Sequence, residues 1–172
     1  MKNWPVLSVA SVTLRVLVVL NWLGGAAILA LLLATIIAEQ WTFTALGIPP
    51  SSEIRPMMTG LRAIALLGLV AVPLNHTVLW RLAAIVETVR GGDPFVAANA
   101  RRLQVIAWVL LALQLLSIVI GAIGKAVSSP ATPVHLDAGF SINGWLAVLF
   151  AFLLARVFAE GARMREDLAG TV

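Results

Sequence analysis

Four long apolar runs dominate the chain, and short polar segments separate them. The runs extend roughly over residues 12–38, 59–80, 103–124 and 142–159. Each is long enough to cross about 30 Å of hydrocarbon as a helix, and none shows the apolar–polar alternation of a barrel strand. Because a helix satisfies its own backbone hydrogen bonds in lipid, the pattern predicts an all-α membrane protein with four transmembrane helices in a single domain, residues 1–172.

The composition supports a membrane protein and narrows the chemistry. Of the 172 residues, 60% are hydrophobic and 12% are charged, whereas soluble domains are about 25% charged. The chain has no cysteine, which excludes disulfides and cysteine-ligated metals. The formal net charge is +4, but the basic residues are scattered among the predicted helix ends. This distribution argues against direct binding of nucleic acid.

The positions of Lys and Arg predict the orientation, because these residues are enriched on the cytoplasmic side of membrane proteins. Four spans place both termini on one side, and nine of the 12 basic residues fall on that side. We therefore expect both termini in the cytoplasm. The nine are Lys2, Arg15, Arg81, Arg90, Arg101, Arg102, Arg156, Arg163 and Arg165, and the other three are Arg55, Arg62 and Lys125.

The segment "VRGGDPFVAANARRL" (residues 89–103, the hinge) lies between the second and third spans. Gly91 suits a left-handed helix C-cap, Asp93 suits the N-cap of a new helix, and Pro94 suits its first turn. The sequence therefore predicts a helical hairpin, broken at the glycines, that projects from the membrane into the cytoplasm.

The polar residues of the hinge have two interpretations. In the structural one, Asp93 caps, Phe95 packs back on the hairpin, and the arginines hold the headgroup level. In the functional one, hinge and tail residues form a docking surface for a cytosolic partner, and hinge acids pair with tail arginines. That predicted docking surface comprises Phe95, Asn99, Arg101, Arg163 and Arg165.

Two stretches carry a family resemblance. They are "GDPFVAANARRL", with Asn99, Arg102 and Leu103, and "VFAEGARMREDLAGTV" (residues 157–172, the tail). With the four spans, they make the chain similar to the bacterial membrane family called domain of unknown function 2975. Gly170 stands where that family generally has Leu. Its members are often encoded beside a small helix-turn-helix regulator, so the resemblance implies a membrane component of a regulatory pair in the bacterial inner membrane.

Polar residues inside the second span are further candidates. His76 could ligate a haem or metal, but one histidine without ligand-type neighbours favours a satisfied structural hydrogen bond. Pro73 could kink the helix and free a carbonyl, which Asn75 or Asn21 could satisfy.

Small residues recur every four positions on the first and fourth spans. Such repeats let helices approach closely in lipid, so we expect these faces to pack on other helices, on each other or on a second copy. The repeats are Ala26, Ala30, Ala34 and Ala38, and Ala147, Ala151, Ala155 and Ala159.

The sequence shows no carboxylate pair, activated nucleophile, metal cluster or phosphate loop. We therefore expect no enzyme and no cofactor. The favoured function is a non-catalytic membrane protein that holds or modulates a cytosolic helix-turn-helix regulator, or senses the state of the membrane. The alternative is a small oligomeric component of transport or export.

Overall fold

The computed structural model describes residues 5–38, 54–128 and 138–169. It contains α1 (Pro5–Ile37), α3 (Ile54–Arg90), α4 (Ala97–Val127) and α5 (Ile142–Ala169). Each helix includes a segment long and apolar enough to cross a membrane, so the predicted all-α class and the four spans are confirmed. The helices extend past the apolar runs, because the polar residues that follow them continue the helical hydrogen bonding.

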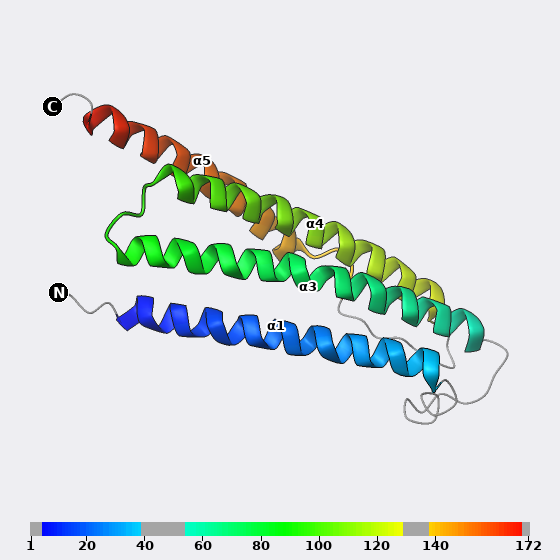
Figure 1. Cartoon of the computed structure of the whole chain (residues 1–172). Coiled ribbons are helices and arrows are strands. Elements are labelled where there is room, and N and C mark those ends of the chain that lie inside the picture. Colours follow the sequence, from blue (N-terminus) through cyan, green and yellow to red (C-terminus); the bar gives the residue numbers. More distant parts are fainter. Residues whose placement is uncertain (1–4, 39–53, 129–137, 170–172) are drawn as a thin grey trace.

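The four helices lie antiparallel, one beside the next in chain order (Figure 1). α1 packs on α3, α3 on α4, and α4 on α5, and within the described part of the chain α1 contacts no other helix. The beginning of α1, the turn between α3 and α4, and the end of α5 all lie at one end of the molecule. We call this the hinge end. The start of α1 and the end of α5 therefore lie on the same side as the hinge, as four spans require.

The small-residue repeats behave differently in the two outer helices. Ala151 and Ala155 of α5 are buried, in the close contact of that helix with α4. In α1, by contrast, Ala26 and Ala30 are exposed, and the helix approaches α3 through Gly25 instead. Within this chain, the expectation that the repeats face neighbouring helices is therefore met at Ala151 and Ala155 of α5, and it is not met at the exposed Ala147 of α5 or at Ala26 and Ala30 of α1. The two repeats also do not pack on each other.

The register of the helices brings arginines to a common level. Arg102 of α4 donates a hydrogen bond to the Ala84 carbonyl of α3 at 3.4 Å, one turn from Arg81. Arg15 of α1 lines a hollow together with the same Ala84. Arg15 of α1 and Arg102 of α4 therefore lie at the level of Arg81 of α3.

The fourth helix joins at the same level. Leu103 of α4 packs with Ala155 of α5 in the core cluster. The residues that precede and follow these two, Arg102 and Arg156, therefore lie at the same level along the helix axes. We call this set of residues the arginine level. It comprises Arg15, Arg81, Arg101, Arg102 and Arg156.

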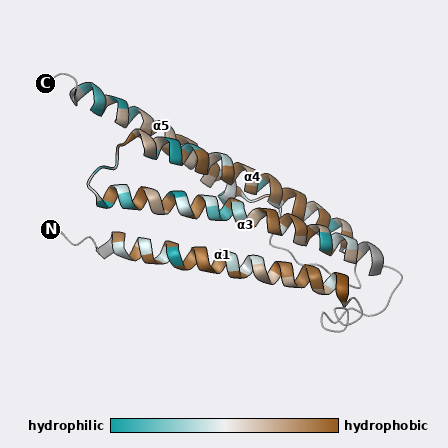
Figure 2. Cartoon of the chain, in the orientation of Figure 1, coloured by the Kyte–Doolittle hydropathy of each residue, from teal (hydrophilic) through white to brown (hydrophobic). Residues whose placement is uncertain are grey.

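A second charged level lies at the opposite end, at Arg62 of α3 and Lys125 of α4. Arg62 is 19 residues from Arg81, and Lys125 is 23 residues from Arg102, which correspond to about 28 and 35 Å of helix. These distances bracket the roughly 30 Å of a hydrocarbon core. We call the part of the helices between the two charged levels the apolar interval. Figure 2 shows the hydrophobic residues concentrated along this interval and the hydrophilic ones gathering at the hinge end.

The hinge end extends past the arginine level. α3 runs nine residues beyond Arg81, and α5 runs 13 residues beyond Arg156, which are about 14 and 20 Å of helix. These segments are therefore outside the apolar interval, and the turn between α3 and α4 lies among them.

Two polar side chains of α1, Asn21 and Trp22, donate hydrogen bonds to α3 inside the apolar interval. α3 continues through Pro73, and Asn21 of α1 donates to the Val72 carbonyl at 3.0 Å. The carbonyl that Pro73 leaves without its helical N–H partner is that of Leu69, so Asn21 bonds the carbonyl next to the proline and not the freed one, and Asn75 is exposed. His76 Nδ1 accepts a hydrogen bond from Trp22 Nε1 at 3.3 Å, which is the structural role favoured by the sequence.

Candidate functional site

The turn that ends α3 is a Schellman motif. The Gly92 N–H donates to the Val89 carbonyl, the Asp93 N–H donates to the Thr88 carbonyl, both at 3.1 Å, and Gly92 has φ +85°. This bonding pattern places the left-handed residue at Gly92. The prediction of a left-handed Gly91 is therefore wrong by one residue, because the Gly91 N–H still makes a helical bond to Glu87.

The start of α4 also differs from the prediction. The helix begins at Ala97, and the residue before it, Val96, is extended and provides no side-chain cap. Asp93 is therefore not the N-cap and Pro94 is not the first helical residue. The Asp93 carboxylate is instead bound by Arg165 of α5, so it is not directed at the amides of the next turn.

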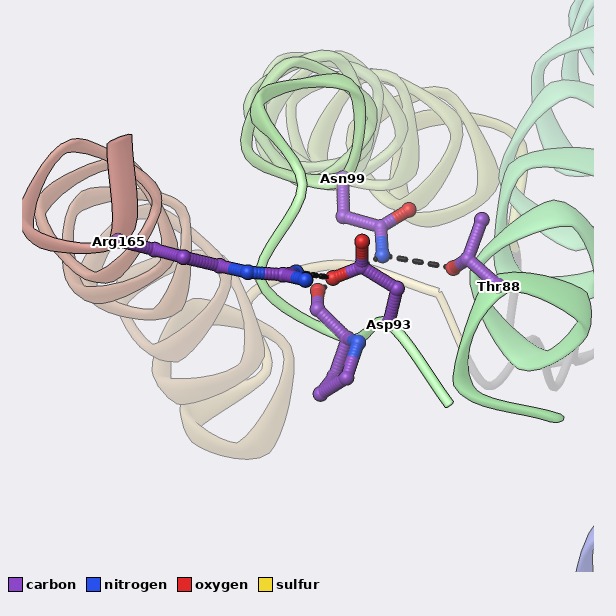
Figure 3. A network of polar contacts seen from close by, with 5 residues as sticks. Thr88, Asp93, Asn99 and Arg165 are labelled. Atoms are coloured by element: carbon purple, nitrogen blue, oxygen red, sulfur yellow. Dashed lines mark hydrogen bonds and ion pairs between the residues drawn. The ribbon is translucent and has the colours of Figure 1, made fainter. Parts of the chain in front are cut away.

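Asn99 is the centre of the hinge and has no exposed surface. Its Nδ2 donates to Thr88 Oγ1 at 2.7 Å and to the Pro94 carbonyl at 2.9 Å, and Figure 3 shows the contact with Thr88. Its Oδ1 accepts from Arg102 at 2.7 Å. Asn99 thus connects the end of α3, the turn and α4. A fully buried side chain offers nothing to a partner, so the structure removes Asn99 from the predicted docking surface.

Two contacts attach the hinge to the tail. Asp93 and Arg165, 72 residues apart, form an ion pair (Figure 3). The Phe95 ring lies 5.3 Å from that of Phe158 and covers Gly161, where an added Cβ would lie 2.8 Å from the Phe95 ring. The structural interpretation thus needs a correction, because Phe95 packs on α5 and not on its own hairpin.

Only one of the expected acid–arginine pairs between hinge and tail forms. Glu87 pairs with Arg90 of its own helix at 3.5 Å, and Arg163 pairs with Glu160 at 3.8 Å. Both are exposed pairs within one helix and contribute little to stability.

These contacts define the hinge–tail junction. Its members are Thr88, Asp93, Phe95, Asn99, Arg102, Phe158, Gly161 and Arg165. Sequence reasoning missed three of them: Thr88, Phe158 and Gly161. Gly161 carried a usable signal, because a glycine inside a helix costs about 1 kcal/mol relative to alanine and therefore indicates a close approach. Thr88 and Phe158 carried no such signal.

The exposed residues at the hinge end are mixed in character. Phe95 retains 43% of its exposure and Met164 retains 56%, and Arg101 and Arg163 of the same end are also exposed. Across the described ranges, no three His, Cys, Asp or Glu residues are grouped as a metal site would require. The arrangement is suited to contact with another molecule through apolar and cationic side chains.

The four spans and the joined hinge and tail define a multi-pass helical membrane protein. The chain belongs to the family described as Protein of unknown function (DUF2975), whose model matches residues 42–172. The match contains α3, α4, α5 and every member of the hinge–tail junction, which confirms the resemblance noted in the sequence. Gly170, the departure from the family pattern, lies outside the described residues. No curated protein and no solved structure matches the chain significantly.

Proposed function

We propose that the protein is a non-catalytic protein of the bacterial inner membrane that holds a cytosolic regulator of helix-turn-helix type at its hinge end. The observation that carries the proposal is the hinge–tail junction. Segments 72 residues apart are fixed together beyond the arginine level, through Asp93 and Arg165 and through Phe95 over Gly161. A plain connection between two spans needs neither contact, whereas a docking surface needs its parts held in fixed relative positions.

The proposed docking surface keeps four of the predicted residues. Phe95 and Met164, both partly exposed, supply apolar contact. The arginines supply orientation, as aromatic and Arg residues do at the centres of interfaces. The surface comprises Phe95, Arg101, Arg163, Met164 and Arg165.

Cytoplasmic placement of the hinge end follows from the excess of basic residues on that side. Because the chain has no cysteine, single cysteines are unique labels. Ala97 and Ala126 lie at opposite ends of α4 and are both exposed. In intact cells an impermeant maleimide should label the Ala126→Cys variant and spare Ala97→Cys until the cells are opened. The reverse pattern would overturn the orientation.

The partner is tested with the full chain in nanodiscs and a purified helix-turn-helix regulator from the same organism, the class of partner that the family resemblance implies. We expect the pair to bind, and the double variant Arg163→Ala, Met164→Ala to bind at least about tenfold more weakly, since truncation of a residue at the centre of an interface costs about 2 kcal/mol or more. Both residues are exposed, so melting should be unchanged. Phe140→Ala, an exposed aromatic at the other end, is the matched control. No binding by the wild type, or equal weakening by the control, would refute the proposal.

A further inference from the structure

A groove of ≈ 430 Å³ lies between α4 and α5 at the hinge end. Its charged lining consists of Arg101, Arg156 and Arg163 with one acid, Glu166, so these side chains carry a formal charge of three minus one, or +2. Alanines from both helices form much of the remaining lining. We call this the α4/α5 groove.

The guanidinium groups of the groove are open to a ligand. Within the described part of the chain, neither Arg101 nor Arg156 has a hydrogen-bond or ion-pair partner, and both are exposed. Arg163 has only the exposed contact with Glu160 at 3.8 Å. These cations lie close together without a neutralising carboxylate between Arg101 and Arg156, which favours an anion in the groove.

The groove has three zones along the helix axis. Arg101 and Arg156 belong to the arginine level. Phe152, which stacks edge-on against Trp108 at 5.2 Å, borders the groove one turn farther into the apolar interval. Arg163 and Glu166 border it on the opposite side, away from the apolar interval. The succession from apolar to cationic to mixed polar matches the succession of acyl chain, phosphate and headgroup in a phospholipid.

We propose that the α4/α5 groove binds one anionic phospholipid. The phosphate diester lies between Arg101 and Arg156, because the planar guanidinium donates paired hydrogen bonds to phosphate oxygens. The start of an acyl chain lies against Phe152 and the alanines. Glu166 accepts from a hydroxyl of the headgroup and repels a multiply charged soluble anion. A basic pocket between transmembrane helices at headgroup level is a recurrent arrangement for anionic lipids.

The groove shares Arg101 and Arg163 with the proposed docking surface, so the lipid is tested at Arg156, which is not part of that surface. The test is native mass spectrometry of the full chain released from phosphatidylcholine nanodiscs that contain phosphatidylglycerol. We expect one retained phosphatidylglycerol on the wild type and about tenfold lower retention on Arg156→Gln, since a charge-assisted hydrogen bond contributes at least about 1.5 kcal/mol. Arg156→Lys should be intermediate, because it keeps the charge and loses the paired geometry.

The matched control is Arg15→Gln, an exposed arginine of the same level on α1 and outside the groove. It should retain the lipid like the wild type. Equal loss in Arg15→Gln and Arg156→Gln would show general attraction to the arginine level and refute a specific site. Displacement of the lipid by inorganic phosphate, or equal retention of phosphatidylcholine, would also overturn the proposal. Melting in pure phosphatidylcholine should not distinguish the variants, which separates lipid binding from folding.

Discussion

Replacement of Asn99 by alanine should destabilise the hinge end more than any other single change at a polar residue there. Asn99 is fully buried and makes three hydrogen bonds, to Thr88, Pro94 and Arg102. The alanine variant loses all three and leaves the Pro94 carbonyl and the Arg102 guanidinium each without one buried partner. The position lies beyond the arginine level, so the energies of aqueous proteins apply.

The expected cost follows from the kinds of bond that are lost. Each of the two neutral bonds contributes about 1 kcal/mol, and the bond from the charged Arg102 contributes about 1.5–3 kcal/mol. The sum is about 3.5–5 kcal/mol, which corresponds to a fall of roughly 7–20 °C in Tm for a chain of this size. Thr88→Val removes one acceptor and leaves one buried N–H of Asn99 without a partner, so it should cost about 1–3 kcal/mol, less than Asn99→Ala.

Thermal unfolding in nanodiscs, followed by tryptophan fluorescence, measures the global effect, and hydrogen exchange locates it. The amides of Gly92 and Asp93, which bond within the Schellman motif, should exchange faster in Asn99→Ala than in the wild type. Amides in the middle of α4 should not. If Asn99→Ala melts no earlier than Thr88→Val, or if exchange rises equally along α4, the central position of Asn99 is refuted.

Three further predictions concern other points of the fold. Gly92→Ala should cost about 1–2 kcal/mol of stability because φ at Gly92 is +85°, whereas Gly91→Ala should melt like the wild type. A lower Tm for Gly91→Ala than for Gly92→Ala would contradict the placement of the left-handed residue at Gly92. Gly121→Ala should lower Tm by several degrees, because the added Cβ would lie 2.6 Å from the Ala138 carbonyl oxygen and overpacking costs about 1–3 kcal/mol; unchanged melting would disprove that close approach. Asp93→Asn should cost under about 1 kcal/mol, as exposed ion pairs do, and the loss should shrink at high salt; a large salt-independent loss would rule out a simple ion pair.

The two stretches that carry the family resemblance meet in space. The hinge stretch contributes Asp93, Phe95 and Asn99, and the tail stretch contributes Gly161 and Arg165. Most of these side chains contact one another, so their immediate role is to fix the tail against the hinge. The residues that our proposals assign to a partner or a lipid are the exposed ones around them.

The sequence alone determined the four spans, the break in the helix at the glycine pair and the unequal distribution of arginine. Each depends on local composition: apolar length decides whether a helix can cross lipid, and glycine with proline decides where it stops. The same reasoning could not choose between Gly91 and Gly92, because both tolerate a left-handed backbone and only the bonds back to Thr88 and Val89 distinguish them.

Only the tertiary structure decided the roles of the hinge side chains. An Asp93 carboxylate can accept from the following amides or from an arginine 72 residues away, and the position of α5 settles which. Asn99 is polar and suits a surface by composition, but the antiparallel packing of α3 and α4 encloses it, and these helices and the turn between them supply all of its partners. Contacts between distant segments depend on helix register, which no single stretch of sequence contains. For that reason the sequence offered several hinge–tail pairs without choosing Asp93 with Arg165, and the α4/α5 groove emerged only from the folded chain.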